Sequence, residues 1–144
     1  GDAALVKAFL LYRTYHCSAM WPAVQAASIA AWNDETHVQE NRALYRRKFA
    51  QVTPMLAQVM QVGLPDAGFY LWARVPDALG MSDTEFARAL LTQYNVTVLP
   101  GSYLARDVNG ANPGAQRVRM ALVAEAGECE QAARRIVQFI QSRI

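Results

Sequence analysis

The order of the predicted elements constrains the fold of this chain more than any single motif does. Apolar residues at helical spacing predict three helices, over about residues 3–14, 22–32 and 34–62. A strand, a helix, two strands and a last helix follow. Because all of the strands come after the first three helices, the first half of the chain has no sheet of its own. We therefore expect an α+β fold in which helices cover one face of a small, mainly antiparallel sheet.

Turn and capping signals separate the elements of the second half. Ser82 and Glu85 have the spacing of a capping box, so a helix is expected to begin there. Asn109-Gly110 favours a tight turn. The predicted strands cover residues 69–75, 96–99 and 116–123, and the predicted helices cover residues 82–93 and 125–142.

The third helix carries a basic run. Its members, mostly off the apolar stripe of the helix, are Arg42, Arg46, Arg47 and Lys48. A charge run of this kind is typical of a solvated helix face, and we expect all four residues to face water. Pro54 has no backbone N–H group, so it is expected to kink or restart the helix.

The composition argues against several classes of function. The net charge of +2, from 14 basic and 12 acidic residues, leaves no dense basic patch for nucleic acid. The apolar stretches are shorter than the ~18 residues that a membrane-spanning helix needs. Cys17 and Cys129 stand alone, without a CxxC motif. They favour a reducing compartment, by default the cytoplasm, over a disulfide scaffold or a zinc site.

Residue patterns alone do not reveal a catalytic site. His16 and His37 belong to no known motif, and the acidic residues lack the HExxH spacing of a zinc enzyme. The chain begins at Gly1 without an initiator methionine, and a capped helix follows at once, so we expect part of a longer protein. On this basis the chain is a soluble α+β domain of unknown function.

Five segments carry a family resemblance through their order and spacing. They are PAVQAASIAAWND, ENRALYRRKFAQVTPML, PDAGFYLWARVP, NVTVLPGSYLAR and RVRMALV. Together they resemble the C-terminal third of the class I and II aminotransferases, which use pyridoxal 5′-phosphate (PLP) and have fold type I. LLYRTYH, PGSYLAR and RVRMALVA are most similar to succinyldiaminopimelate aminotransferase. Members of that subgroup often carry glycine where this chain has Cys17.

The resemblance implies a cofactor that this chain cannot hold alone. In the family, a lysine in an SxSK-like motif anchors PLP and moves the proton, while PLP serves as the electron sink. Neither Lys7 nor Lys48 lies in such a motif. The PLP lysine is therefore expected upstream of Gly1. The chain alone is expected to contain no catalytic residue, to bind no PLP and to be inactive.

The resemblance also implies a domain organisation. Residues 1–33 would be helices of the large domain and the dimer interface, residues 34–62 a connecting helix, and residues 63–144 the small C-terminal domain. The implied partners are an amino-acid or 2-oxo-acid substrate, the large domain of the same protein, and a second copy in a homodimer.

One arginine is implied to bind substrate. Family members hold the α-carboxylate with an arginine on a small-domain strand, and in RVRMALV that position is Arg119. Arg117 shares its strand face and is the alternative. A guanidinium is planar and permanently charged, and it pairs with a carboxylate through two parallel hydrogen bonds.

Two further segments are implied at the substrate pocket. The loop that begins at Arg13 corresponds to a loop that reaches the active site of the partner subunit. There, Arg13 and His16 would meet the distal acidic end of the substrate, and Tyr15 would line the pocket. Packing at the dimer interface is the alternative for this loop. Tyr103 either shapes the mouth of the cleft or belongs to the core.

The resemblance implies a reaction for the longer protein. This reaction is the transfer of an amino group between glutamate and N-succinyl-2-amino-6-oxopimelate, in lysine and diaminopimelate biosynthesis. Aminotransferases of alanine, aspartate, LL-diaminopimelate or aromatic amino acids are the alternatives within the family. A free-standing α+β ligand-binding module is the alternative from another class.

Overall fold

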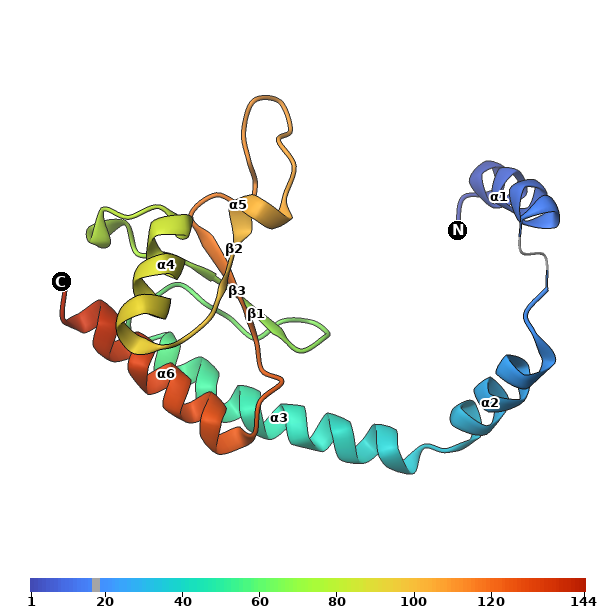
Figure 1. Cartoon of the computed structure of the whole chain (residues 1–144), viewed down its shortest axis with the longest axis horizontal. Coiled ribbons are helices and arrows are strands. Elements are labelled where there is room, and N and C mark those ends of the chain that lie inside the picture. The colour runs from blue at the N-terminus through green and yellow to red at the C-terminus, as the bar shows by residue number, and fades with distance from the viewer. Residues whose placement is uncertain (17–18) are drawn as a thin grey trace. The chain divides into compact units, whose positions relative to one another are not determined.

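The structure, a computed structural model, describes residues 1–16 and 19–144. It consists of two compact units, Gly1–Glu40 and Asn41–Ile144 (Figure 1). The division falls within helix α3 (Thr36–Leu56), whereas the predicted boundaries follow residues 33 and 62. Most of the predicted connecting helix therefore belongs to the second unit.

Two helices make up most of the first unit, α1 (Ala3–Tyr15) and α2 (Pro22–Asn33). Asp2 caps α1, because its Oδ1 accepts hydrogen bonds from two backbone N–H groups of the first turn, each at 3.0 Å. Pro22 is the first residue of α2, a position where no helical partner for its missing N–H is needed. Both predicted helices are confirmed.

Neither α1 nor α2 buries a residue within its unit. The large apolar side chains that the two helices expose are Leu5, Val6, Phe9, Leu10, Leu11, Tyr12, Tyr15, Val24, Ile29 and Trp32. Surfaces that bind other proteins are often rich in exposed apolar side chains of this kind. Over the described part of the chain, no helix has the length and apolar character needed to cross a membrane.

The second unit is built on a three-stranded antiparallel sheet with the strand order β1-β3-β2. β1 (Tyr70–Arg74) and β3 (Arg117–Ala121) pair along their whole length. β2 (Leu99–Pro100) is a short edge strand, and an edge tolerates Pro100 because no partner awaits its missing N–H. The antiparallel sheet is confirmed. However, a strand was predicted at residues 96–99, and β2 begins only at the last of them. Val96 and Val98 are buried but do not belong to the strand pairing of β2 with β3.

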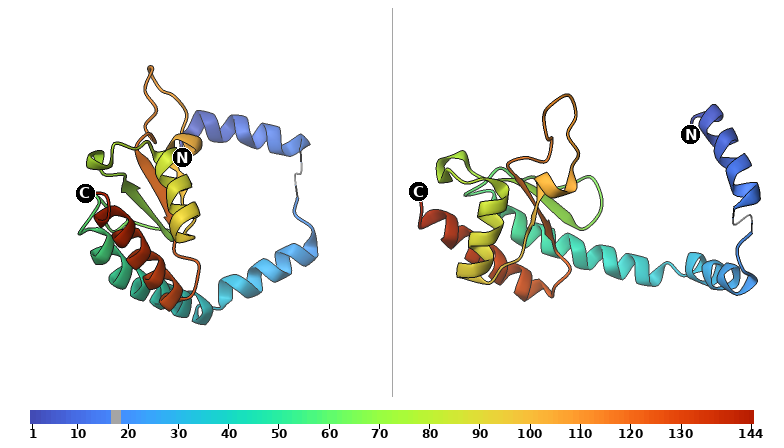
Figure 2. Two further views of the ribbon diagram at one scale, coloured as in Figure 1. Left: turned by 60° about the vertical axis from the view of Figure 1, so that its left-hand side comes forward. Right: turned by 45° about the horizontal axis from the view of Figure 1, so that its top comes forward.

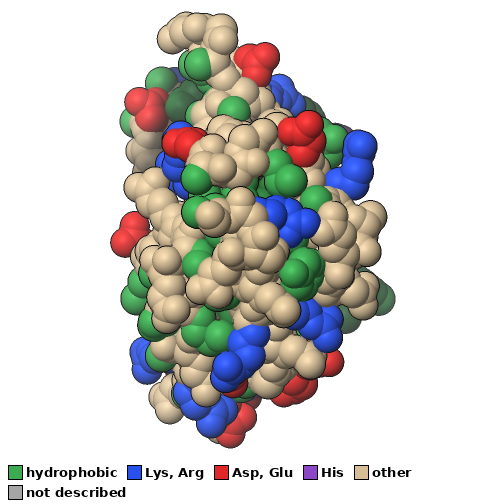
Figure 3. All heavy atoms as spheres, turned by 90° about the vertical axis from the view of Figure 1, so that its left-hand side faces the viewer, with side chains coloured by type: hydrophobic (Ala, Val, Ile, Leu, Met, Phe, Trp, Pro, Cys, Tyr) green, Lys and Arg blue, Asp and Glu red, His purple; other side chains and the backbone are tan. Residues whose placement is uncertain are grey.

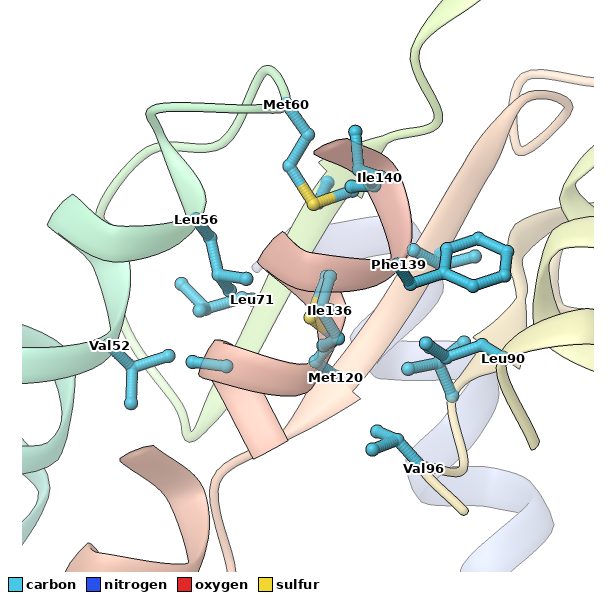
Figure 4. Packing of buried hydrophobic residues seen from close by; sticks show 14 of the residues in the cluster. Val52, Leu56, Met60, Leu71, Leu90, Val96, Met120, Ile136, Phe139 and Ile140 are labelled. Carbon is cyan, nitrogen blue, oxygen red and sulfur yellow. The ribbon is translucent and has the colours of Figure 1, made fainter. Parts of the chain in front are cut away.

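Helices cover one face of this sheet. They are the C-terminal part of α3, α4 (Asp83–Tyr94) and α6 (Ala126–Gln141), and α3 and α6 lie side by side in every view (Figures 1 and 2). Their apolar side chains meet those of β1 and β3 in one core (Figure 4). The ring of Phe139 is contacted edge-on by Phe86 and Tyr94, at centroid distances of 5.4 and 5.5 Å. Each fully buried side chain of this size stabilises the fold by roughly 1.5–3 kcal/mol.

The capping box at the start of α4 is confirmed. The Glu85 carboxylate accepts hydrogen bonds from the backbone N–H of Ser82 at 2.9 Å and from its hydroxyl at 2.7 Å. These bonds favour the ionised form, so they hold the pKa of the Glu85 carboxyl below its usual value. Asn95 ends the helix in the left-handed conformation, with a φ of 51°.

Lys48 does not lie on a solvated face, so the prediction for this residue was wrong. Its side chain is 3% exposed, and its ammonium donates hydrogen bonds to the carbonyls of Leu122 at 3.0 Å and Val123 at 3.4 Å. Lys48 borders the apolar stripe at Phe49, and a lysine can bury its methylene groups while its charge meets carbonyl oxygens. The other three members of the basic run are exposed, as expected.

Three local features differ from the predicted elements. α3 continues through Pro54 and ends at Leu56 rather than near residue 62. Two short helices, η1 (Asp77–Leu79) and α5 (Gly101–Leu104), were not predicted. Elements of three or four residues are too short to show a helical period in the sequence.

The environments of the two cysteines and of the surface charges can be described only in part. Cys129 is buried, and burial raises the pKa of its thiol; Cys17 lies outside the described residues. Among the residues that the structure describes, no group of His, Cys, Asp and Glu is arranged to hold a metal ion. Basic, acidic and apolar side chains are interspersed on the face in Figure 3.

Candidate functional site

The face of the sheet opposite the helices is not covered by the core. Side chains alternate along each strand, so β3 buries Val118 and Met120 and turns Arg117 and Arg119 the other way. This confirms the prediction that the two arginines share a face. The side chains of the open face are Tyr70, Trp72 and Arg74 from β1, Leu99 from β2, and Arg117 and Arg119 from β3.

Arg119 lies at the centre of this open face. In the strand register it is opposite Trp72 of β1 on one side and Leu99 of β2 on the other. Its Cζ lies 4.3 Å from the centroid of the Tyr70 ring, which is a cation–π contact. Arg119 is half-buried. Its cross-strand neighbours and the Tyr70 ring are therefore neutral, and they shield one side of it from water.

Arg117 has different surroundings although it shares the same strand face. It lies opposite Arg74 in the register, so its nearest cross-strand neighbour is another cation. Arg74 in turn donates two hydrogen bonds to the Asp77 carboxylate, at 3.0 and 3.1 Å. This end of the sheet already contains its own carboxylate, which makes it less suited than the surroundings of Arg119 to bind an external anion.

Sequence reasoning missed Tyr70, whose ring forms the cation–π contact with the guanidinium of Arg119. The signal that could have indicated it is alternation within the strand predicted at residues 69–75. Alternation places Tyr70 and Trp72 on one face, and pairing with β3 places that face beside the arginines. The pairing register of two strands distant in sequence is what the sequence does not supply.

Tyr103 lies on α5, at the base of the loop that joins β2 to β3. It is 74% exposed, so it is not part of the core, which was one of its two expected positions. The base of the loop is tightly packed. A methyl group added at Gly101 would lie 2.7 Å from Cη2 of Trp72 and 2.9 Å from the carbonyl oxygen of Arg117, and closer still to the carbonyl of Gly114.

Hydrogen bonds hold the same loop base. Asp83, which is 4% exposed at the start of α4, accepts a hydrogen bond from the backbone N–H of Ser102 at 2.8 Å. The Asn112 amide donates to the Ser102 carbonyl at 3.2 Å, and its oxygen accepts from the N–H of Gly114 at 2.9 Å. The start and end of the loop are thus tied to each other and to α4.

The residues predicted at the partner-subunit pocket belong to the first unit. Arg13 and Tyr15 are in the last turn of α1, and His16 is its C-cap. All three are exposed, and the His16 ring lies 5.2 Å from that of Tyr12. The remainder of the predicted loop includes residues 17 and 18, which lie outside the described residues. The role of this loop stays a prediction.

Neither lysine of the sequence fits the role of the PLP lysine. That role needs an amine that is available beside a cradle for the cofactor. The ammonium of Lys48 is buried and engaged by two backbone carbonyls. Lys7 is exposed on α1, a helix that buries none of its residues. No catalytic step through PLP is therefore assigned to the residues of this chain.

Comparisons with known proteins agree with this fold. Residues 2–136 match the family described as aminotransferase class I and II. An aminotransferase structure from Neisseria meningitidis Z2491 is 55% identical, with a TM-score of 0.84 over 97% of this chain and 35% of that chain. An LL-diaminopimelate aminotransferase of Nitratidesulfovibrio vulgaris (strain DSM 19637 / Miyazaki F) is 34% identical over 96% of this chain and 34% of the relative. A probable N-succinyldiaminopimelate aminotransferase from Thermus thermophilus is 31% identical, with a TM-score of 0.60 over 74% of this chain and 26% of that one.

The chain spans about a third of the length of the first two of these relatives. The family match nonetheless covers almost all of the chain. The antiparallel sheet, its covering helices and the order of the five sequence segments agree with that match. This chain belongs to the aminotransferase class I and II family.

Proposed function

We propose that this chain is the C-terminal, substrate-binding part of a PLP-dependent aminotransferase, in which Arg119 binds the substrate α-carboxylate. The observation that carries the proposal is the position of Arg119 on the open sheet face, half-buried and in cation–π contact with Tyr70. None of the ion pairs formed within residues 1–16 and 19–144 includes it. A guanidinium that is fixed, partly shielded from water and without a carboxylate of its own is suited to bind one from outside.

The geometry favours Arg119 over Arg117. A guanidinium binds a carboxylate through N–H groups at the edge of its plane. Arg119 lies with its Cζ over the Tyr70 ring, 4.3 Å from the ring centroid, and this contact uses none of its N–H groups in an ion pair within the described residues. Arg117 is opposite Arg74, whose charge is already paired with Asp77. The two arginines differ in their neighbours rather than in their type.

PLP is the cofactor of this proposal. When bound, it would supply the electron sink for the amino-acid carbon from which the proton is removed. Lys7 and Lys48 do not fit its lysine, so the proposal assigns that lysine to the longer protein, outside this chain. The 144-residue chain is accordingly proposed to bind substrate weakly, to hold no cofactor and to be inactive alone.

The proposed reaction is amino transfer between glutamate and N-succinyl-2-amino-6-oxopimelate. The likeness to the probable N-succinyldiaminopimelate aminotransferase supports this substrate. In the proposal, Arg13 and His16 reach the partner subunit and meet the distal acidic end of the substrate, with Tyr15 beside them. LL-diaminopimelate is the second candidate, because the relative that acts on it matches 96% of this chain.

The proposal also includes two protein partners, the large domain of the same protein and a second copy in a homodimer. The exposed apolar side chains of α1 and α2 support it, because nothing in their own unit buries them. The cytoplasm is the proposed location. The comparisons do not favour a free-standing module, because the relatives named above are aminotransferases.

Two substitutions in the full-length protein test the role of Arg119. Removing one charge-assisted pair costs about 1.5–3 kcal/mol, so Arg119→Gln is expected to raise the KM for glutamate by roughly 10- to 150-fold. Arg117→Gln, the matched control, is expected to change it less than about threefold. Steady-state kinetics checks both values. If Arg117→Gln causes the large loss and Arg119→Gln does not, the assignment is wrong.

Substrate profiling of the same full-length protein tests the finer assignment. N-Succinyl-2-amino-6-oxopimelate is expected to be the better amino acceptor, with glutamate as donor. Faster turnover with LL-diaminopimelate as amino donor and 2-oxoglutarate as acceptor would replace the first candidate substrate with the second.

A further inference from the structure

Three aromatic rings connect a buried cation on α3 with the candidate substrate arginine on β3. The Lys48 Nζ lies 4.9 Å from the centroid of the Tyr45 ring. The ring centroids of Tyr45 and Phe69 are 5.8 Å apart, and those of Phe69 and Tyr70 are 4.3 Å apart. The centroid of the Tyr70 ring then lies 4.3 Å from the Cζ of Arg119. We call Tyr45, Phe69 and Tyr70 the aromatic row.

We propose that the aromatic row positions the guanidinium of Arg119 for the substrate carboxylate, and that Tyr45 on α3 is a positioning residue for substrate binding. The inference rests on the proposed role of Arg119. It adds groups of α3 that do not touch Arg119 and that act on it only through Phe69 and Tyr70.

The contact between Tyr70 and Arg119 explains why such a row matters for binding. A long, flexible arginine side chain loses rotamer entropy when it is held in one conformation. A ring against the guanidinium face restricts that freedom before the substrate arrives, and it leaves the N–H groups at the edge unoccupied. Binding energy is then not spent on ordering the side chain. Tyr70 can provide this restraint only if its own ring is held.

Phe69 and Tyr45 supply that support. Tyr70 is the first residue of β1, and it is half-buried on the open face, so the strand alone leaves its ring room to move. Phe69 contacts Tyr70 on one side and Tyr45 on the other. The three rings are not stacked in parallel, since neighbouring rings are tilted by 37° in both pairs. Tilted contacts of this kind are favourable for aromatic side chains.

Backbone hydrogen bonds join the same three elements at the same point. The N–H of Leu122 donates to the carbonyl of Phe69 at 3.0 Å. The carbonyl of Leu122 accepts from the Lys48 ammonium at 3.0 Å. α3, the start of β1 and the end of β3 are therefore fixed together, so a change in the α3 side chain is expected to reach Arg119 through the rings.

Tyr45 offers a clean way to interrupt the row. It lines a groove of about 840 Å³ between α3 and residues 64–69, and it is half-buried rather than enclosed in the core. Tyr45→Leu removes the ring without leaving a sealed cavity, so the protein is expected to fold. Tyr45→Phe keeps the ring and removes only the hydroxyl. Tyr94→Leu is the matched control, because Tyr94 is also half-buried and contacts Phe139, which is not in the row.

The experiment measures KM and kcat for glutamate in the full-length protein, together with the thermal midpoint Tm. Tyr45→Leu is expected to raise KM by about 3- to 30-fold. The lower value corresponds to the loss of one ring contact, and the upper value to partial misplacement of the guanidinium that binds substrate. Its kcat at saturating glutamate is expected to stay within about twofold, because the row orders the binding group and not the reacting atoms. Tyr45→Phe is expected to behave like the parent. Tyr94→Leu is expected to lower Tm while its KM stays near that of the parent.

The outcomes separate this inference from the proposed function. If Arg119→Gln raises KM but Tyr45→Leu changes it no more than Tyr94→Leu does, the aromatic row has no positioning role. If Arg119→Gln itself leaves KM unchanged, the proposed function fails and the inference fails with it. Should Tyr45→Leu not fold, Phe69→Leu interrupts the same row, and an unchanged KM in that variant overturns the inference.

Discussion

Substituting Gly101 by alanine is expected to destabilise the protein through steric contact alone. The φ of Gly101 is not in the left-handed region, so alanine is compatible with its backbone conformation. The added methyl group, however, would lie 2.7 Å from Cη2 of Trp72 and 2.9 Å from the carbonyl oxygen of Arg117, and nearer still to the carbonyl oxygen of Gly114. Two of these three obstacles are backbone atoms, which cannot rotate away as a side chain can.

The size of the effect follows from those distances. Non-bonded carbon atoms are comfortable at about 3.5–4.0 Å, so the loop base must open by roughly 1 Å to admit the methyl group. Overpacking of this kind costs about 1–3 kcal/mol. For a chain of this length, that loss lowers Tm by roughly 4–12 °C. The Trp72 ring and the carbonyl of Arg117 belong to the strands around Arg119, so carboxylate binding in the full-length protein is expected to weaken as well.

Thermal unfolding of the 144-residue chain, followed by circular dichroism, measures the effect. Gly127→Ala is the control, because an added methyl group there meets no atom within 4 Å. Gly127 lies in the first turn of α6, where alanine is expected to leave Tm unchanged or to raise it through its better helix propensity. If the two variants unfold at the same temperature, the loop base absorbs a methyl group without cost, and the steric reasoning is refuted.

Two further predictions concern the first unit and α4. The chain is expected to self-associate as its concentration rises, because α1 and α2 expose large apolar side chains; sedimentation velocity should show less association for the Leu10→Glu/Trp32→Glu variant, and a monomer at every concentration would contradict this. The carboxylate of Glu85 has a folded-state pKa below its ordinary 4.5, so its stabilisation is present above pH 4.5 and is lost as the pH falls through the lower folded value. The Tm of Glu85→Gln is therefore expected to lie below that of the parent at pH 7 and to approach it in acid, and a Tm difference that does not change with pH would contradict the role of the capping box.

Much of the fold could be predicted because its signals are local. The cap at Asp2, the capping box at Ser82 and the alternation in β3 each depend on neighbouring residues, and each is present as expected. The edge strand β2 could not be located well, because only pairing with β3 distinguishes Leu99 and Pro100 from the buried valines before them. A local sequence pattern does not indicate which distant segment a strand pairs with.

The candidate site could be predicted only in part, for a related reason. Alternation and the family resemblance indicated Arg119 and its rival, but the surroundings that separate the two come from other strands. Lys48 was misjudged because its acceptors are backbone carbonyls far along the chain, and any residue type supplies a carbonyl. The role proposed for Tyr45 likewise depends on its contact with Phe69, a residue 24 positions away that lies beside it only in the folded chain.

The close contact of Gly101 with Gly114 brings together the two ends of the loop that projects from the sheet between them. The chain leaves β2 and returns to β3 at almost the same point, and Asn109 and Gly110 form a tight reversal at the far end, both with positive φ. Lengthening a flexible loop adds only about 0.6 kcal/mol for each doubling. Residues inserted near that reversal would therefore change the outer surface of the protein while the strands that present Arg119 keep their register. The length and sequence of this loop can therefore vary, by evolution or by design, without moving Arg119.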